Sequence, residues 1–384
     1  MTVALTLLLL LLPTQTARAP ASPTAFETIV RQADEARASD RLPEAIRLYR
    51  EAVKLRPSWS TGWWWLGSIY YDQDRFAEAQ QAFAHFIATG KAVAPAYGFL
   101  GLCEYETRDY DHAAEHFRRW VQKGSPGTSQ LIDVASFHFA LLLTREGHFF
   151  EALYLLGKKV EKHGPDPALA EAMGLAWMRM KNVPEDYPPE RREMVWIAGM
   201  ASVYLSAQQL DRVHEFQDRL AAHYGDQPDV HYFRGYVYEF EKKYDEAARE
   251  YRQELKISPD HAAAMVQLAL MDVEDSRLEE GSALAQRAIV LEPKSALAHY
   301  AMGRVLLAKE QWQESAVQLE LARNLAPESA NVRFHLATAY KNLGRSADAQ
   351  RENAAFETLK NKEEVLASPR EKLKASPENR TNTQ

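Results

Sequence analysis

The 384-residue chain contains a single cysteine, Cys103. One thiol cannot form an intrachain disulfide, and its position in the middle of an expected helix indicates a buried, inert side chain. No histidine and aspartate can be assigned to it as catalytic partners. We therefore expect neither a disulfide scaffold nor a cysteine nucleophile.

The sequence also lacks the motifs that carry catalysis or cofactor binding. It has no glycine-rich phosphate loop, no H-E-x-x-H, no G-x-S-x-G and no paired-cysteine metal site. His112, His116 and His138 could be neighbours, but no carboxylate lies beside them at ligand spacing, which favours ordinary satisfied or solvated histidines. We expect no catalytic residue, no cofactor and no metal.

An excess of basic residues is lacking as well. Lys and Arg number 46 against 53 Asp and Glu, which gives a formal net charge of −7. This balance argues against nucleic acid as a partner. The hydrophobic content of 46% and the charged content of 26% are those of a folded protein rather than a disordered one.

The N-terminal apolar run, Ala4–Leu12, is too short to span a bilayer comfortably but suits the core of a secretory signal. Ala19-Pro20-Ala21 offers a small-residue cleavage site, although the first three residues carry no Lys or Arg. We expect residues 1–21 to be a signal peptide and the protein to be periplasmic or secreted. After cleavage no stable membrane span is expected, and an uncleaved short anchor is the alternative.

What the sequence does contain is a repeat. A small residue recurs ten times, with steps of 34, 34, 39, 34, 27, 34, 34, 34 and 34 residues. A fixed period of this length marks an array of stacked units, each of which contacts only its neighbours. The ten positions are Ala33, Gly67, Gly101, Ala140, Gly174, Ala201, Gly235, Ala269, Gly303 and Ala337.

The residues around these positions have the spacing W-x2-L-G-x2-Y…A-x3-F. In the second unit they are Trp63, Leu66, Gly67, Tyr70, Ala79 and Phe83. Over residues 26–357 the chain resembles the tetratricopeptide repeat family. The resemblance implies an all-α, right-handed superhelical solenoid of about nine to ten helix-turn-helix units. The small residue of the first helix is expected to face Ala79 or its equivalent on the second, so that the two backbones approach closely.

Proline closes four of the units, at Pro57, Pro259, Pro293 and Pro327. Proline cannot continue a helix, so each of these positions predicts the end of a second helix.

Two steps break the period. The 39-residue step comes from a turn-rich insertion at Lys123–Ser129. The 27-residue step comes from Val183–Pro189, where three prolines forbid the second helix of the fifth unit. Helical pattern ends near Asn182 and resumes near Glu190.

The breaks predict two blocks, 26–182 and 190–357, joined by a proline-rich segment at 183–189. A helical cap that fades into a disordered tail is expected at 358–384. The favoured interpretation of 183–189 is a degenerate repeat with a stiff connector. The alternative is a bend or docking loop between two binding surfaces.

The family resemblance also predicts which residues face a partner. In this family the second, fifth, ninth and twelfth places of the first helix line the inner face. Here those places are rich in aromatic residues, which suits an extended or helical peptide. A terminal-carboxylate clamp needs Lys at the fifth place and Asn at the ninth, and that pair is absent. The expected groove residues are Trp64, Tyr71, Tyr232, Tyr236, Tyr300, Arg304, Phe334 and Lys341.

The resulting hypothesis is a non-catalytic scaffold that binds a protein or peptide in an aromatic groove. A cell-wall glycan or peptidoglycan is an alternative ligand, because aromatic rings stack on sugars as readily as they hold peptides. A remote alternative is an enzyme that uses Glu185 or Asp186 at the break. The sequence leaves the identity of the partner and the oligomeric state open.

Overall fold

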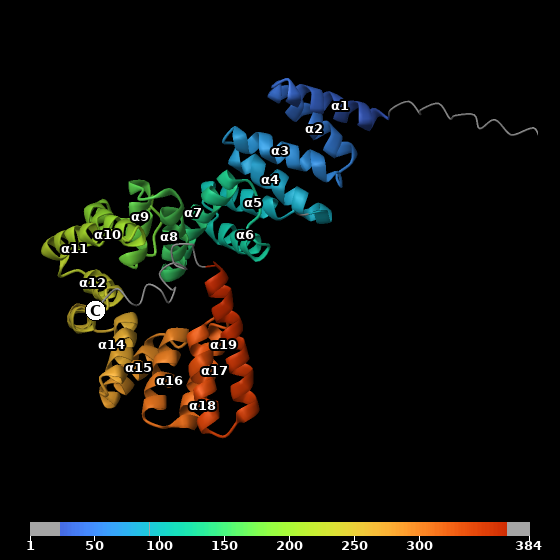
Figure 1. Cartoon of the computed structure of the whole chain (residues 1–384). Coiled ribbons are helices and arrows are strands. Elements are labelled where there is room, and N and C mark those ends of the chain that lie inside the picture. The colour runs from blue at the N-terminus through green and yellow to red at the C-terminus, as the bar shows by residue number, and fades with distance from the viewer. Residues whose placement is uncertain (1–23, 92, 367–384) are drawn as a thin grey trace, which may run out of the picture. The chain divides into compact units, whose positions relative to one another are not determined.

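The computed structural model describes residues 24–91 and 93–366, and within them it contains nineteen α-helices and no strand (Figure 1). This confirms the all-α class. The expected signal peptide and the end of the expected tail lie outside the described residues. The chain forms two compact units, Met1–Leu142 and Leu143–Gln384. The predicted division at 183–189 stays a prediction.

The helices of the first unit are arranged as consecutive antiparallel pairs, and α7 crosses from the first unit into the second. In chain order they are α1 (Ala25–Ala38), α2 (Leu42–Leu55), α3 (Ser60–Asp72), α4 (Phe76–Phe86), a π-helical turn (Ile87–Lys91), α5 (Ala94–Glu106), α6 (Tyr110–Gln122) and α7 (Ser129–Glu146).

The second unit also consists of consecutive α-helices, and two short 3₁₀ turns lie between the helices of its first part. Its elements are α8 (Phe149–His163), a 3₁₀ turn (Pro167–Leu169), α9 (Ala170–Trp177), a 3₁₀ turn (Pro189–Arg191), α10 (Arg192–Ser206), α11 (Leu210–Tyr224), α12 (Val230–Phe240), α13 (Tyr244–Ile257), α14 (Ala262–Glu274), α15 (Leu278–Leu291), α16 (Ala296–Ala308), α17 (Trp312–Leu325), α18 (Ala330–Asn342) and α19 (Ser346–Leu366).

The turn inside each helix pair has one left-handed residue, placed seven residues after the small residue of the period. Most of these residues are not glycine, so the turn holds them in a backbone region that costs about 1 kcal/mol or more. Helix ends are equally regular, because each of the four predicted prolines follows a helix end by two residues. The left-handed turn residues are Asp40, Asp74, Arg108, Gly147, Gln208, Lys242, Ser276, Glu310 and Gly344.

At two of the glycines of the period, the small residue of the first helix makes room for a ring. A Cβ added at Gly67 would lie 2.8 Å from the ring of Phe83, and one added at Gly101 would lie 2.9 Å from the ring of Phe117. The nearest atoms at Gly67 are therefore those of a ring, and the expected approach of the backbone beside Ala79 stays a prediction. The aromatic residue four places after that alanine occupies the space.

The fifth unit lacks a second helix, as the prolines of 183–189 predict, and its turn therefore differs from those of the other units. Helix α9 ends at Trp177, and the left-handed turn residue comes early, at Arg179 with φ 45°. The chain then runs without α-helix to Arg192.

Helix α10 packs directly against α9 in place of the missing helix. A Cβ added at Gly174 would lie 1.9 Å from the carbonyl oxygen of Val195, and one at Gly199 would lie 1.7 Å from that of Ala170. Here two backbones do approach closely, and only glycine allows it. The side chain of Tyr187, from the proline-rich segment, is buried beside this pair.

Cys103 is fully buried, and burial raises the pKa of its thiol to about 12. The burial confirms the expected buried thiol, and a raised pKa disfavours the reactive thiolate at neutral pH.

We predict that Gly199→Ala lowers the free energy of unfolding by about 1–3 kcal/mol or more, because its methyl group would overlap backbone that cannot move alone. Urea unfolding of the full chain measures the change. Gly98→Ala is the matched control, since its Cβ would meet nothing closer than 3.4 Å. Equal stability of the two variants would contradict the direct packing of α9 on α10.

Candidate binding groove on the second unit

Two of the expected groove residues lie in the first unit. Trp64 and Tyr71, both on α3, are half-buried and meet at the ring of Phe99, at centroid distances of 5.9 and 5.2 Å. Burial raises the pKa of Tyr71 to about 12. This pair forms an aromatic cluster within the first unit, and the other six residues lie in the second.

In the second unit the fifth and ninth places of the first helices differ in exposure. At the fifth place Tyr232 is 2% and Tyr300 is 8% exposed, whereas Phe334, in the last repeat, is 46% exposed. The ninth place is partly exposed in the last four repeats, at Tyr236, Leu270, Arg304 and Thr338, whereas Leu175 and Ser202 at the same place of α9 and α10 are buried. The ninth place, and the fifth place of the last repeat, are therefore the ones a partner can reach.

The difference follows from stacking. The ring of Tyr232 lies 4.7 Å from that of His261, at the start of the next first helix, and the ring of Tyr300 lies 5.5 Å from that of His335, in the middle of the next first helix. Within the described residues no further repeat follows Phe334, whose ring lies 5.4 Å from that of Phe356 on α19. Lys341 is exposed at the end of α18.

Tyr232 belongs to the core and not to an accessible groove. Its hydroxyl has no hydrogen-bond partner within the described residues, although it is completely buried. Burial also raises the pKa of this hydroxyl far above its ordinary value. The position was expected to face a partner because the register was correct while the cover from the next repeat was not visible in the sequence.

A polar ladder crosses three repeats on the exposed side of these helices. Arg304 donates one hydrogen bond to Glu274 at 2.6 Å and another to the Tyr300 hydroxyl at 3.3 Å. That hydroxyl lies 3.3 Å from Nδ1 of His335, which donates to the carbonyl oxygen of Asn331. Burial lowers the pKa of His335, so its ring is neutral at neutral pH.

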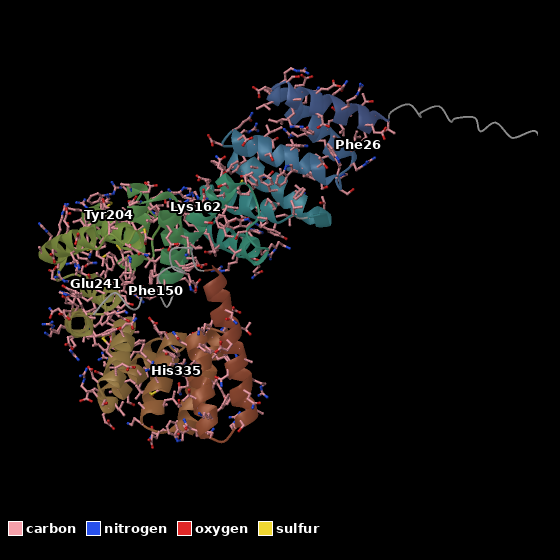
Figure 2. The ribbon with its side chains drawn as sticks, viewed as in Figure 1. Phe26, Phe150, Lys162, Tyr204, Glu241 and His335 are labelled. Atoms are coloured by element: carbon pink, nitrogen blue, oxygen red, sulfur yellow. The ribbon has the colours of Figure 1, made fainter. Side chains whose placement is uncertain are left out.

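An aromatic cluster lies at the other end of the second unit, and the sequence reasoning found only Tyr236 of its four rings. Trp177 stacks on Phe233 at 4.0 Å and lies 4.8 Å from Tyr236. Phe150, labelled in Figure 2, lies 6.2 Å from both Trp177 and Tyr236 and is 42% exposed. Phe150 comes from a second helix, and the family pattern assigns only first helices to the inner face.

Two hollows adjoin this cluster and share Arg179, Ala262 and Glu292. Their volumes are about 400 and 230 Å³. The larger one is bordered by Asp229 and His261, and the smaller one by Phe150.

The larger hollow is built on a buried network. Glu254 accepts hydrogen bonds from the backbone N–H groups of Asp229 and Tyr232 and so caps α12. The side chain of Asp229 is thereby free to accept a hydrogen bond from Nε2 of His261 at 2.8 Å. Nδ1 of His261 accepts from the backbone N–H of Ala264, so both ring nitrogens have partners and neither is available as a general base.

The proline-rich break borders a third hollow, of about 520 Å³. Tyr187 in its wall donates a hydrogen bond to Glu171 at 2.6 Å, and Trp196 is exposed beside it. Neither Glu185 nor Asp186, the residues of the enzyme alternative, belongs to the lining as the described residues define it.

The three histidines that could have formed a metal site have separate partners. His116 lies 2.7 Å from the buried Glu104, and His112 lies 2.8 Å from Asp109. Within residues 24–91 and 93–366 no group of three potential ligands is placed to hold a metal ion. None of the helices in that part of the chain has the length and apolarity that crossing a bilayer requires.

Stacked helix pairs with an accessible row of side chains define a helical-repeat solenoid, a class of fold used for protein interaction. The family model for the tetratricopeptide repeat matches residues 30–92, 70–128 and 228–261. These matches show tetratricopeptide repeats in residues 30–128 and 228–261 and confirm the resemblance.

Similar solved structures have low sequence identity. MamA 41-end from Desulfovibrio magneticus RS-1 is 16% identical over 44% of this chain and 96% of its own, with a TM-score of 0.39. YrrB, described as a TPR protein with an unusual peptide-binding site, is 16% identical over 53% of this chain and 91% of its own, with a TM-score of 0.35. A chain of the APC/C hetero-tetramer Cut9–Hcn1 is 12% identical over 88% of this chain and 66% of its own, with a TM-score of 0.39.

At these TM-scores the solved structures add no argument about the site, and the assignment depends on the repeat pattern and the family matches. No curated protein matches the chain.

We predict that Tyr232→Phe leaves the free energy of unfolding unchanged or raises it, because the hydroxyl it removes is buried without a partner. Tyr232→Ala should lower it by about 3–5 kcal/mol, the usual cost of removing a buried aromatic ring. Urea unfolding followed by circular dichroism compares the two. A stable, fully helical Tyr232→Ala variant would show that the ring is not core.

We predict that His335 makes the protein less stable in mild acid. The pKa of His335 is lower in the folded chain than in the unfolded chain. As the pH falls below about 6.5, the ordinary pKa of histidine, the unfolded chain therefore binds a proton first, and the free energy of unfolding decreases. His335→Gln should therefore lose less stability than the wild type between about pH 7.5 and pH 5. Identical losses, measured as urea midpoints at both pH values, would contradict a buried neutral ring.

Proposed function

We propose that the chain is a non-catalytic scaffold that holds an extended peptide segment of a partner protein along the inner side of α12, α14, α16 and α18. One observation carries the proposal: partly exposed residues recur every 34 residues at the ninth place of these helices. An extended peptide presents side chains along one line, so a regular row of contacts fits it better than a compact ligand.

The chemistry of the row supports a peptide with both apolar and polar side chains. Its ends have exposed rings, Phe150 and Phe334, and its middle has the Arg304–Glu274 ion pair. Aromatic anchors supply most of the binding energy in such grooves, and a peptide backbone can share the hydrogen bonds of the ladder. The signal-like N-terminus supports a role outside the cytoplasm.

The proposal predicts binding that depends on the exposed rings. A phage-displayed library of linear peptides is selected on the full chain, and the recovered peptides are then measured against Phe150→Ala and Phe334→Ala. Each substitution should weaken binding about tenfold or more, as the loss of an aromatic anchor does.

Val317→Ala is the matched control, because Val317 on α17 is 47% exposed and Phe334 is 46% exposed. Equal losses in the control, or recovery of no peptide that depends on either ring, would overturn the proposal. Binding to cell-wall glycan strands that depends on the same two rings would favour the glycan alternative instead.

A further inference from the structure

The lining of the smaller hollow combines apolar and charged side chains. The apolar ones are Phe150 from α8, Val266 from α14 and Leu297 from α16. The charged ones are Glu151, Arg179 and Glu292. Such a lining suits a guest that is apolar along its length and charged at its end.

The charge of the two hollows is mostly negative. Together they are lined by four carboxylates, those of Glu151, Asp229, Asp260 and Glu292, and by one guanidinium, that of Arg179. With neutral histidines this leaves a formal excess of three negative charges. A carboxylate or phosphate guest would be repelled by this lining.

Arg179 is shared between two carboxylates. It forms ion pairs with Asp229 at 3.6 Å and with Glu292 at 3.7 Å, and both distances are longer than a good hydrogen bond. The Arg179 guanidinium also lies over the ring of Phe149, at 4.7 Å. Within the described residues the carboxylate of Glu292 accepts no hydrogen bond.

Glu151 is in a similar position. Nδ1 of His148 lies 3.6 Å from its carboxylate, and the side chain of Glu151 is mostly exposed. The carboxylates of Glu151 and Glu292 therefore have acceptor atoms available beside the apolar side chains of the slot. An apolar guest would desolvate both without replacing their hydrogen bonds, which is unfavourable.

We propose that this slot binds a lysine or arginine side chain of the peptide partner. The methylene stem lies along Phe150, Val266 and Leu297, and the charged head donates hydrogen bonds to Glu292 and Glu151. The exposed ring of Phe150 adds a cation–π contact. The inference depends on the proposed peptide groove and names the chemistry that the groove selects.

The test uses the same peptide selection, with the full chain. Recovered peptides should be enriched in Lys or Arg at one fixed position. Replacing that Arg by citrulline, which has the same shape without the charge, should weaken binding about tenfold or more. Glu292→Gln should weaken binding by a similar factor.

A charge swap separates a direct contact from a structural role. Glu292→Lys should reject the basic peptide and should bind the same peptide with Glu in place of Arg. Glu314→Lys, which makes the same charge change at an exposed position of α17, is the control and should leave binding unchanged.

The outcomes distinguish the two proposals. Peptides that depend on Phe150 and Phe334 but have no basic position, and that are unaffected by Glu292→Lys, would overturn the basic slot and leave the scaffold proposal standing. Recovery of no ring-dependent peptide would overturn the scaffold proposal itself.

Discussion

The packing of a large side chain of one helix into the space left by a glycine or alanine of its neighbour holds this protein together. A single helix pair exposes an apolar face that it cannot bury alone, so each pair is stable only against the next. At Gly67 and Gly235 that space is filled by Phe83 and Tyr251, and at Gly303 by Leu319. The 34-residue period, the turn geometry and the positions of the prolines together bring the two residues of this contact to the same place in each repeat.

The fifth unit shows what happens when the partner helix is removed. Proline prevents the second helix, so the packing surface of α9 has to be covered by something else, and α10 covers it through the two glycines 174 and 199. The early turn brings Arg179 to a place where a regular unit would have continued into helix. There it borders both hollows and lies between Asp229 and Glu292. The irregular unit thus supplies the one cation of a mostly acidic site.

The candidate groove depends on what each repeat leaves uncovered. A first helix covers the fifth place of the helix before it, so those rings stabilise the stack, and the ninth place remains accessible. The last repeat is different, because within the described residues no further repeat follows it, and Phe334 is 46% exposed. The same stacking energy that stabilises the array therefore decides which side chains are left for a partner, and the ends of the row are its most exposed rings.

Much of the fold could be predicted from the sequence, because helix pairing depends on local and periodic features. The 34-residue period, the prolines after the helices and the proline-rich segment at 183–189 determine the class, the number of helices per unit and the missing helix. The inner-face register stays a prediction of the family resemblance. The exposure of these positions could not be predicted from the sequence, because Tyr232 and Tyr300 are covered by His261 and His335, which lie in the next repeat. The hollow beside Phe150 could not be predicted at all: its lining comes from Gly147 to Leu297, and only the curvature of stacked repeats brings those residues together.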